Sequence, residues 1–524
     1  MRASLLLIVS LCAPCGIALA DSGADLPMSA APIASGPSCA GVVYVDANGN
    51  GHRDRRESPV VGVHVSDGAQ VASTDRHGRY QFTPAAERRL FLIKPAGYRA
   101  ATRGDGLPDT WAETPGSCRD FPLRRERLAR GVALDVLVLG DPQPKIAKHL
   151  EYYQRDILDP LRANPRATLA VSLGDLVDDQ QQLYPGLKQA DATLGIPWLH
   201  APGNHDVDAE GDDAHALGGF HAAFGPDTYA WEEAQANFVV LDDVITRPGG
   251  GKSYVGGLRE EQFQFLAAYL SGADRSRLLV LALHIPLFDV GGVETFRHQD
   301  RARLFAMLAP FPHLLVLSAH THSQMHVYHD ASDGWVGATP LHEYNVGTAC
   351  GAYWTGVKDT DGIPASTMSD GTPNGYARMR VSADASVAVR WYAARAPEDA
   401  QIGLHSPGVI RRGAYPGFGV YANVWMGGPD TTVEFRVDDG AWKPMARWNF
   451  PDPALVAENM RDDDAATLRG YDRATEAGMS THLWRAAVPT DLALGEHRVD
   501  VRSQIDDFGL ATASTTYRLE DAQP

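Results

Sequence analysis

Cysteine is scarce in this chain: there are five among 524 residues, and two of them lie in the first twenty positions. The other three are Cys39, Cys118 and Cys350, and an odd number excludes a framework in which every cysteine is paired. Cys39 and Cys118 bracket the first β-like segment. We expect these two to form a disulfide in an oxidising compartment, which leaves Cys350 as a free thiol.

Long apolar runs are also missing. No segment reaches the ~20 residues that span a bilayer, which disfavours stable insertion in a membrane. Residues 1–20 instead join Arg2 to a short apolar stretch that ends in Ala18-Leu19-Ala20, the small-x-small pattern of a cleavage site. We therefore expect residues 1–20 to be a cleaved signal peptide and the protein to be periplasmic or secreted.

Basic side chains are the minority, since 47 Lys and Arg stand against 65 Asp and Glu, a formal net charge of −18. Such a surface repels nucleic acid and anionic membranes, so we expect neither as a partner. Two hydrolase signatures are absent from the sequence as well. It has no G-x-S-x-G motif of a serine hydrolase, and residues 342–346, HEYNV, lack the second histidine of a zinc peptidase.

The pattern of apolar runs and turn residues changes twice along the chain, and these changes predict three domains. Short β-branched runs between turn residues predict a small β-sandwich. Apolar runs that alternate with helical stretches then predict an α/β domain with internal strands. The rest is β-like and begins with a loop rich in Gly, Asp, Thr and Pro. The predicted ranges are 21–38 for a linker, 39–125 for the β-sandwich, 130–348 for the α/β domain and 349–524 for the C-terminal β-rich domain, with the long loop at 350–376.

Polar side chains follow the strands of the predicted α/β domain, at the end where ligands bind in such folds. A Gly-Asp or Gly-Asn pair after one strand is usually a turn, but a series at successive strand ends indicates a shared site. Asp, Asn and His side chains with one shared carboxylate can hold two divalent ions roughly 3.5–4 Å apart, the geometry that serves phosphoryl transfer. The candidates are Asp141, Gln143, Asp175, Asn204, His205, His284, His320 and His322.

Their order, D-x-Q, G-D-x-x-D, G-N-H-D, H-x-P and H-x-H, closely resembles the motifs of the calcineurin-like metallophosphoesterases. The resemblance implies an α/β/β/α sandwich for the middle domain. The flanks resemble the small N-terminal β-domain, B-type and immunoglobulin-like, and the C-terminal region of certain secreted bacterial members. Two positions depart from the family pattern: Gln143 stands where most members have His, and Ala319 stands where the last motif usually has Gly.

The same resemblance implies a set of metal ligands. Two divalent ions would share the Asp175 carboxylate as a bridge, with Mn²⁺ as the expected metal and Zn²⁺, Fe²⁺ or Mg²⁺ as alternatives. A water or hydroxide that bridges the two ions would be the nucleophile. The implied ligands are Asp141, Asp175 and His322 for the first metal, and Asp175, Asn204, His284 and His320 for the second.

His205 resembles the histidine that contacts the phosphate and protonates the leaving oxygen, with Asp206 as its orienting partner. The implied reaction is hydrolysis of a phosphomonoester or a phosphodiester, on a phosphorylated small molecule or an envelope phosphodiester. The alternative is a non-catalytic envelope binding protein whose phosphoesterase core has decayed. A decayed core would be expected to lose His205 or a ligand, and among these positions only Gln143 is unusual.

Gln143 itself allows two interpretations. Its carbonyl oxygen could bind the first metal, and an oxygen ligand in place of an imidazole would suit a harder ion such as Mn²⁺ or Mg²⁺ and weaken that site. The amide could instead brace the loop through hydrogen bonds, as polar side chains in turns commonly do. We expect the ligand role.

Residues 46–57, DANGNGHRDRRE, match the template of a calcium loop at every position. Strand-like runs flank them, as in collagen-adhesin B-type surface domains, where a similar acidic loop joins strands. Three arginines, Arg53, Arg55 and Arg56, oppose a cation, so a calcium site and a solvated turn both stay open. The candidate calcium ligands are Asp46, Asn48, Asn50, Asp54 and Glu57 around the bend at Gly51.

The long loop carries two neighbouring aromatic residues, Tyr353 and Trp354. Their rings could stack on a sugar or base of the substrate, or they could pack under the loop. We expect packing. The sequence leaves open whether the substrate is a monoester or a diester.

Overall fold

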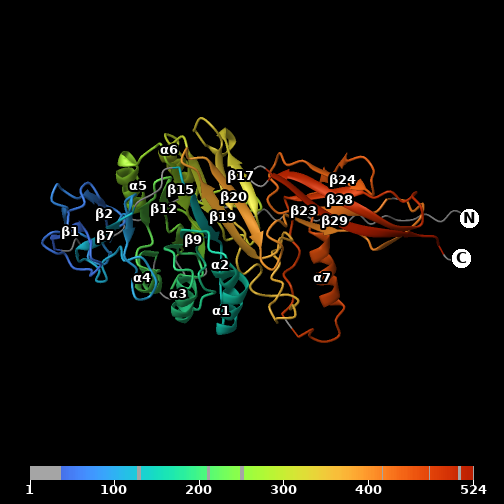
Figure 1. The fold of residues 1–524 in the computed structure, drawn as a ribbon, viewed down its shortest axis with the longest axis horizontal. Helices are drawn as coiled ribbons and strands as arrows, with labels where there is room; N and C mark the ends of the chain where they lie inside the picture. Colours follow the sequence, from blue (N-terminus) through green and yellow to red (C-terminus); the bar gives the residue numbers. More distant parts are fainter. Residues whose placement is uncertain are drawn as a thin grey trace, which may run out of the picture.

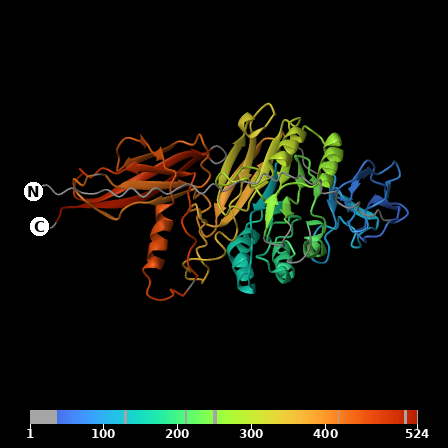
Figure 2. The ribbon, with the colours of Figure 1, turned by 180° about the vertical axis from the view of Figure 1, so that it is seen from behind.

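The structure, a computed structural model, describes residues 37–126, 131–208, 213–247, 253–415, 417–470, 472–505 and 509–522. The expected signal peptide and most of the linker at 21–38 lie outside these residues. Figure 1 shows an elongated molecule with a small β-domain at one end, a layered α/β domain in the middle and a second β-domain at the other end, and Figure 2 shows the same order from behind. No helix in the described part of the chain is long and apolar enough to cross a membrane.

Two sheets form the centre of the molecule. The first has the order β10-β9-β8-β19-β20, and the second has the order β11-β12-β15-β16-β18-β17. Strands β8, β9 and β10 are parallel, as are β12, β15, β16 and β18. The bounds are β8 Leu134–Leu139, β9 Leu169–Leu173, β10 Trp198–Ala201, β11 Tyr229–Glu232, β12 Ala236–Val240, β15 Leu278–Ala282, β16 Leu314–Ser318, β17 Met325–His329, β18 Leu341–Asn345, β19 Gly375–Val381 and β20 Val387–Ala393.

The parallel strands β8, β9, β15 and β16 are nearly continuous apolar runs because both faces of the sheets are covered at their positions. In β8, Val136 and Val138 pack in the core between the two sheets, whereas Leu137 and Leu139 pack in the core that also contains helix side chains such as Tyr153. The helices are α1 Ala147–Tyr153, α2 Asp159–Ala163, α3 Tyr184–Ala192, α4 Gly218–Phe224, α5 Glu260–Gly272 and α6 His298–Leu308, and a π-helical segment, Gln154–Leu158, joins α1 to α2. The layers confirm the predicted α/β/β/α sandwich.

Strands β19 and β20 lie beyond the predicted domain boundary at 348/349, yet they extend the first central sheet. We assigned residues from 349 onward to the C-terminal β-domain, but β19 pairs with β8 in the first central sheet, with Ala377 opposite Val138. The long loop at 350–376 therefore leaves the second sheet and returns to the first. Sequence patterning alone does not reveal this, since β19 and β20 form an antiparallel pair that reads like any strand of the domain after it.

The N-terminal domain consists of two small sheets, β4-β1-β7-β6 and β3-β2-β5. The structure confirms the expected disulfide between Cys39 and Cys118, which are 79 residues apart, and Cys350 is a buried free thiol. Lys94 fixes the domain to the central one, because its Nζ is buried and lies 2.6 Å from Oε1 of Glu233. The strand bounds are β1 Cys39–Val45, β2 His64–Ser66, β3 Val71–Ser73, β4 Arg79–Phe82, β5 Phe91–Leu92, β6 Tyr98–Ala100 and β7 Phe121–Arg125.

The C-terminal domain is β-rich, as expected, with the sheets β21-β23-β27-β26 and β22-β29-β28-β24-β25. Its helix α7, Pro453–Asp463, begins at Asp452, whose side chain accepts hydrogen bonds from the backbone N–H groups of Ala454 and Leu455. The strand bounds are β21 Ile402–His405, β22 Val409–Arg411, β23 Gly419–Val424, β24 Val433–Val437, β25 Lys443–Pro444, β26 Ala446–Arg447, β27 Leu483–Ala487, β28 Gly495–Ile505 and β29 Gly509–Glu520.

Candidate metal centre

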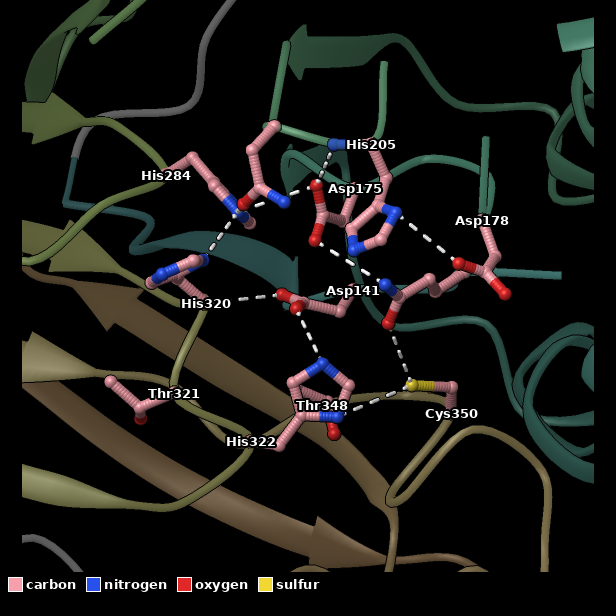
Figure 3. A network of polar contacts seen from close by, with 12 residues as sticks. Asp141, Asp175, Asp178, His205, His284, His320, Thr321, His322, Thr348 and Cys350 are labelled. Atoms are coloured by element: carbon pink, nitrogen blue, oxygen red, sulfur yellow. Dashed lines mark hydrogen bonds and ion pairs between the residues drawn. The ribbon is translucent and has the colours of Figure 1, made fainter. Parts of the chain in front are cut away.

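The expected ligands converge where the central strands end. Asp141 follows β8, Asp175 follows β9, Asn204 follows β10, and the loops after β15 and β16 supply the histidines. Figure 3 shows Asp141, Asp175, His284, His320 and His322 pointing toward one another. Several of them have a positive φ, a strained backbone conformation that clusters at functional sites. The strained positions are Asp141 at 36°, Gln143 at 42°, Asp175 at 46°, His320 at 71° and His322 at 48°.

Glycine permits the close approach of these loops. A Cβ on Gly203 would lie 2.2 Å from the backbone nitrogen of Asp175 and 2.3 Å from its Oδ1. A Cβ on Gly174 would lie 2.6 Å from Nδ1 of His284. The G-D and G-N pairs of the motifs therefore serve packing around Asp175, in addition to forming turns.

The first group of donors contains Asp141 and His322. The Oδ2 atom of Asp141 is buried and lies 3.1 Å from Nε2 of His322. Nδ1 of His322 lies 2.7 Å from the carbonyl oxygen of Gly351, to which it would donate its proton. This contact leaves the Nε2 lone pair facing Asp141, which is the arrangement of a metal-ligating histidine.

The second group contains Asp175, Asn204, His284 and His320. Nε2 of His284 lies 3.1 Å from Oδ1 of Asn204, 3.1 Å from Nδ1 of His320 and 3.4 Å from Oδ1 of Asp175. Nδ1 of His284 lies 2.8 Å from the carbonyl oxygen of Leu173, so this backbone group again fixes the tautomer. Imidazole nitrogens, a carboxylate and an amide oxygen thus face one common point.

Asp175 connects the two groups. Its Oδ1 accepts the backbone N–H of His205 at 2.8 Å on the side of the second group, while its Oδ2 lies 3.4 Å from the amide nitrogen of Gln143. The carboxylate is buried. Each of the two oxygens of Asp175 therefore lies on the side of a different group of donors.

The charges of the site favour a cation. Burial opposes a positive charge on His284, yet Asp175 and Asp141 raise its pKa to about 10. Burial likewise opposes ionisation of Asp175, but His284 and the other nearby rings hold the pKa of this carboxyl below its usual range. Burial and the charge of His284 lower the pKa of His320 to about 4. The mixture of oxygen and imidazole donors, with the buried carboxylates of Asp141 and Asp175 among them, fits divalent transition metals.

His205 lies beside this centre, but its ring does not contact Asp206, the partner that we expected. Nδ1 of His205 lies 2.9 Å from Oδ1 of Asp179 and 3.2 Å from Oδ1 of Asp178. Oδ2 of Asp206 instead accepts the backbone N–H groups of Leu176 and Gly203. Our assignment of Asp206 as the orienting partner of His205 is therefore wrong. Asp206 braces the loops after β9 and β10 and does not orient the His205 ring.

Asp206 is fully buried, and Tyr184 donates a hydrogen bond to its Oδ1 at 2.9 Å. Burial, together with the charge of Asp175, raises the pKa of Asp206 to about 7. A group in this setting stabilises the loops and has no access to a substrate.

Gln143 is buried between Asp175 and Cys350. Its amide nitrogen faces Oδ2 of Asp175, and its carbonyl oxygen lies 3.6 Å from Sγ of Cys350. These contacts match the bracing role. The ligand role needs the amide to turn by about 180°, which exchanges its oxygen and nitrogen positions with little change of shape.

The other departure, Ala319, is accommodated by its neighbour. A Cβ on Gly140 would lie only 3.2 Å from the Cβ of Ala319, so the methyl group of Ala319 occupies space that Gly140 leaves free.

The sequence did not assign several residues that support the site. Asp178 and Asp179 stand in the motif GDLVDD, and their spacing after Asp175 was the available signal. Asp243 accepts the backbone N–H groups of His284 and Ile285. Cys350 lies 3.8 Å from Nδ1 of His322, although the odd cysteine count identified it only as a free thiol.

Hydrogen bonds within the loop hold the candidate calcium loop at residues 46–57 together. Asp46 accepts the backbone N–H groups of Gly49, Asn50 and Gly51, and the amides of Asn48 and Asn50 donate to Oδ2 of Asp54. Both carboxylate oxygens of Glu57 also accept backbone N–H groups, from Ala47 and Asp54. Arg124 lies so close that a Cβ on Gly49 would be 1.7 Å from its Nη2. A calcium ion at this loop stays a prediction.

Comparisons with known proteins agree with this geometry. The sequence matches the N terminal of Calcineurin-like phosphoesterase over residues 47–125, Calcineurin-like phosphoesterase over residues 134–324, and the C terminal of Calcineurin-like phosphoesterase over residues 343–511. The three matches succeed one another along most of the chain. The chain belongs to the calcineurin-like phosphoesterases, a family of phosphoric ester hydrolases.

No curated protein matches the sequence. Among solved structures, the chain is similar to a purple acid phosphatase from seeds of yellow lupin, Lupinus luteus, with 12% sequence identity and a TM-score of 0.38. The similarity covers 63% of this chain and 66% of that chain, slightly less than two thirds of the phosphatase.

Proposed function

We propose that this protein is a metal-dependent hydrolase of phosphoric esters. The observation that carries the proposal is the position of Asp175, a buried carboxylate with one oxygen on the side of His284 and Asn204 and the other on the side of Gln143. A carboxylate shared by two donor groups is the central feature of a binuclear site. Membership in the phosphoesterase family supports the same reaction.

Two divalent ions, when bound, would polarise a phosphoryl oxygen and lower the pKa of a water molecule in the site. Asp141, Gln143 and His322 would hold one ion, and Asn204, His284 and His320 the other, with Asp175 between them. The backbone carbonyls of Gly351 and Leu173 orient two of these histidines before any metal arrives. Mn²⁺ is our first expectation, with Zn²⁺, Fe²⁺ and Mg²⁺ as alternatives.

His205 would protonate the leaving oxygen. Its Nδ1 faces Asp178 and Asp179, so the ring is held in a single orientation and Nε2 is left to donate a proton. The side chain is 27% exposed, which gives a substrate access to it. His205 is placed beside the donor groups without occupying either of them.

We propose export by the signal peptide at residues 1–20, and hence a substrate outside the cytoplasm: a phosphorylated small molecule or an envelope phosphodiester, cleaved as a monoester or a diester. The non-catalytic alternative needs a decayed site. The retention of His205 and of every donor except the one at Gln143, where most members have His, supports the enzyme.

The test is hydrolysis of p-nitrophenyl phosphate and bis(p-nitrophenyl) phosphate by the full chain loaded with Mn²⁺ or Zn²⁺. We expect turnover of at least one ester, its loss in Asp175→Asn, and no change in Asp384→Asn, which alters an exposed turn between β19 and β20. Absence of hydrolysis with every metal and both esters would favour the binding protein.

A further inference from the structure

Two tyrosine rings lie against the metal-centre histidines. The ring of Tyr353 packs on that of His322, with centroids 4.6 Å apart and an angle of 31° between the planes. The ring of Tyr254, at the start of β14 Tyr254–Gly256, meets that of His320 edge to face, with centroids 5.8 Å apart. One ring comes from the long loop and the other from β14, yet they contact neighbouring histidines of one loop. Aromatic side chains therefore border the centre at two places.

Tyr353 does not pack under the long loop, contrary to our expectation. Its side chain is 49% exposed, whereas Trp354 is 3% exposed and packs as expected. The exposed ring is thus available to a ligand at the position where it covers His322.

The backbone of Tyr353 has an energetically unfavourable conformation in this position. Tyr353 and Trp354 both have a φ of 59°, a left-handed conformation that is unfavourable for bulky residues. Trp354 compensates, because its Nε1 donates a hydrogen bond to the carbonyl oxygen of Pro142 at 2.9 Å and its ring packs against Tyr152. Strain that the surroundings maintain in this way is characteristic of binding sites.

Among the described residues, the hydroxyl groups of Tyr353 and Tyr254 have no hydrogen-bond partner, and Tyr254 is only partly exposed. A buried or half-buried tyrosine normally finds such a partner. The two side chains present a π-face and a hydroxyl to whatever lies over the centre.

We propose that Tyr353 and Tyr254 form an aromatic rim that binds the leaving group of the phosphoester, so that esters with a flat aromatic group are preferred. The inference rests on the proposed function for the reacting ester and adds its substrate class. Aromatic contacts contribute beyond the area that they bury, and base stacking on such side chains is tolerant of the ring's identity. A nucleoside and a simple aryl group share this chemistry.

The test compares ligands that differ only in the ring. Adenosine 5′-monophosphate and ribose 5-phosphate carry the same ester bond, and phenylphosphonate and methylphosphonate form a pair that cannot be hydrolysed. Dissociation constants are measured by calorimetry on the metal-loaded full chain, and kcat/KM is measured for the esters. We expect the aromatic member to bind about 3- to 10-fold more tightly. A preference in the first pair alone identifies a nucleoside, and a preference in the phenyl pair identifies any aryl group.

Variants of Tyr353 test whether the preference for the aromatic ligand comes from the rim. Tyr353→Ala should bring the ratio close to one, Tyr353→Phe should keep it because the ring remains, and Tyr415→Ala, at a tyrosine that is 94% exposed in the C-terminal domain, should leave it unchanged. Equal binding within both pairs, or a preference that survives Tyr353→Ala, overturns the rim. Hydrolysis without a preference leaves the proposed function intact, whereas a Tyr353-dependent preference without hydrolysis upholds the rim and rejects the function.

Discussion

Replacing Gly203 by Ala tests the geometry of the centre without removing any donor. The new Cβ would lie 2.2 Å from the backbone nitrogen of Asp175 and 2.3 Å from its Oδ1, and ordinary contact begins at 3.4 Å. Asp175 must therefore move by about 1 Å, since packed interiors leave no room for the overlap. Gly203 does not have a positive φ, so the effect comes from this contact and not from backbone strain.

A displacement of about 1 Å at a reacting centre costs about 10²-fold in rate. We expect Gly203→Ala to lower kcat/KM for a phosphoester by about that factor and to reduce the bound metal. Overpacking costs about 1–3 kcal/mol of stability, which is less than the roughly 5–15 kcal/mol that holds a typical domain folded. The variant should therefore still fold.

The assay combines initial rates, metal content by mass spectrometry and a thermal melt. Gly408→Ala is the matched control, because a Cβ there meets nothing within 4 Å and the backbone has no positive φ. If Gly203→Ala binds metal and turns over substrate as well as the control does, the position of Asp175 is not what the chemistry depends on.

Three further predictions concern single histidines and Gln143. His205→Ala should lower kcat by about 10²- to 10⁴-fold with unchanged metal content, and loss of metal would show that His205 is a ligand. Gln143→His should tighten the first site and shift its preference toward Zn²⁺; unchanged titrations would establish the bracing role. Burial among neighbouring rings lowers the pKa of His326 to about 3, and burial lowers that of His342 to about 4. Because the unfolded chain binds protons below a pH of about 6.5, these two rings should lower the free energy of unfolding as pH drops from about 6.5 toward 4, whereas the raised pKa of Asp206 acts in the opposite sense. Urea titrations should show a smaller fall of this kind in His326→Gln than in the unchanged chain; an equal pH dependence of the two would contradict the shift of His326.

The sequence predicted the central fold because its parallel strands are buried on both faces. The runs that became β8, β9, β15 and β16 are apolar at all but one position or fewer, and the polar residues after them mark the strand ends. The ligand groups follow from that topology, since the carboxyl ends of parallel strands share one edge.

Side-chain partners were harder to predict. The motifs offer three carboxylates that could face the His205 ring: Asp178, Asp179 and Asp206. Only the loop conformation decides which of them does so. Tyr353 and Trp354 are adjacent in the sequence, but a left-handed backbone turns one outward and buries the other. The joining of β19 to β8 depends on long-range pairing that local pattern does not encode.

We propose that two divalent ions at this centre are required for phosphoester hydrolysis. The most direct measurement is the rate of hydrolysis as metal is removed with a chelator and returned by titration, with bound metal counted at each step. We expect activity to be lost with the metal and to recover as the second ion per chain binds. Full activity in the metal-free protein would contradict it.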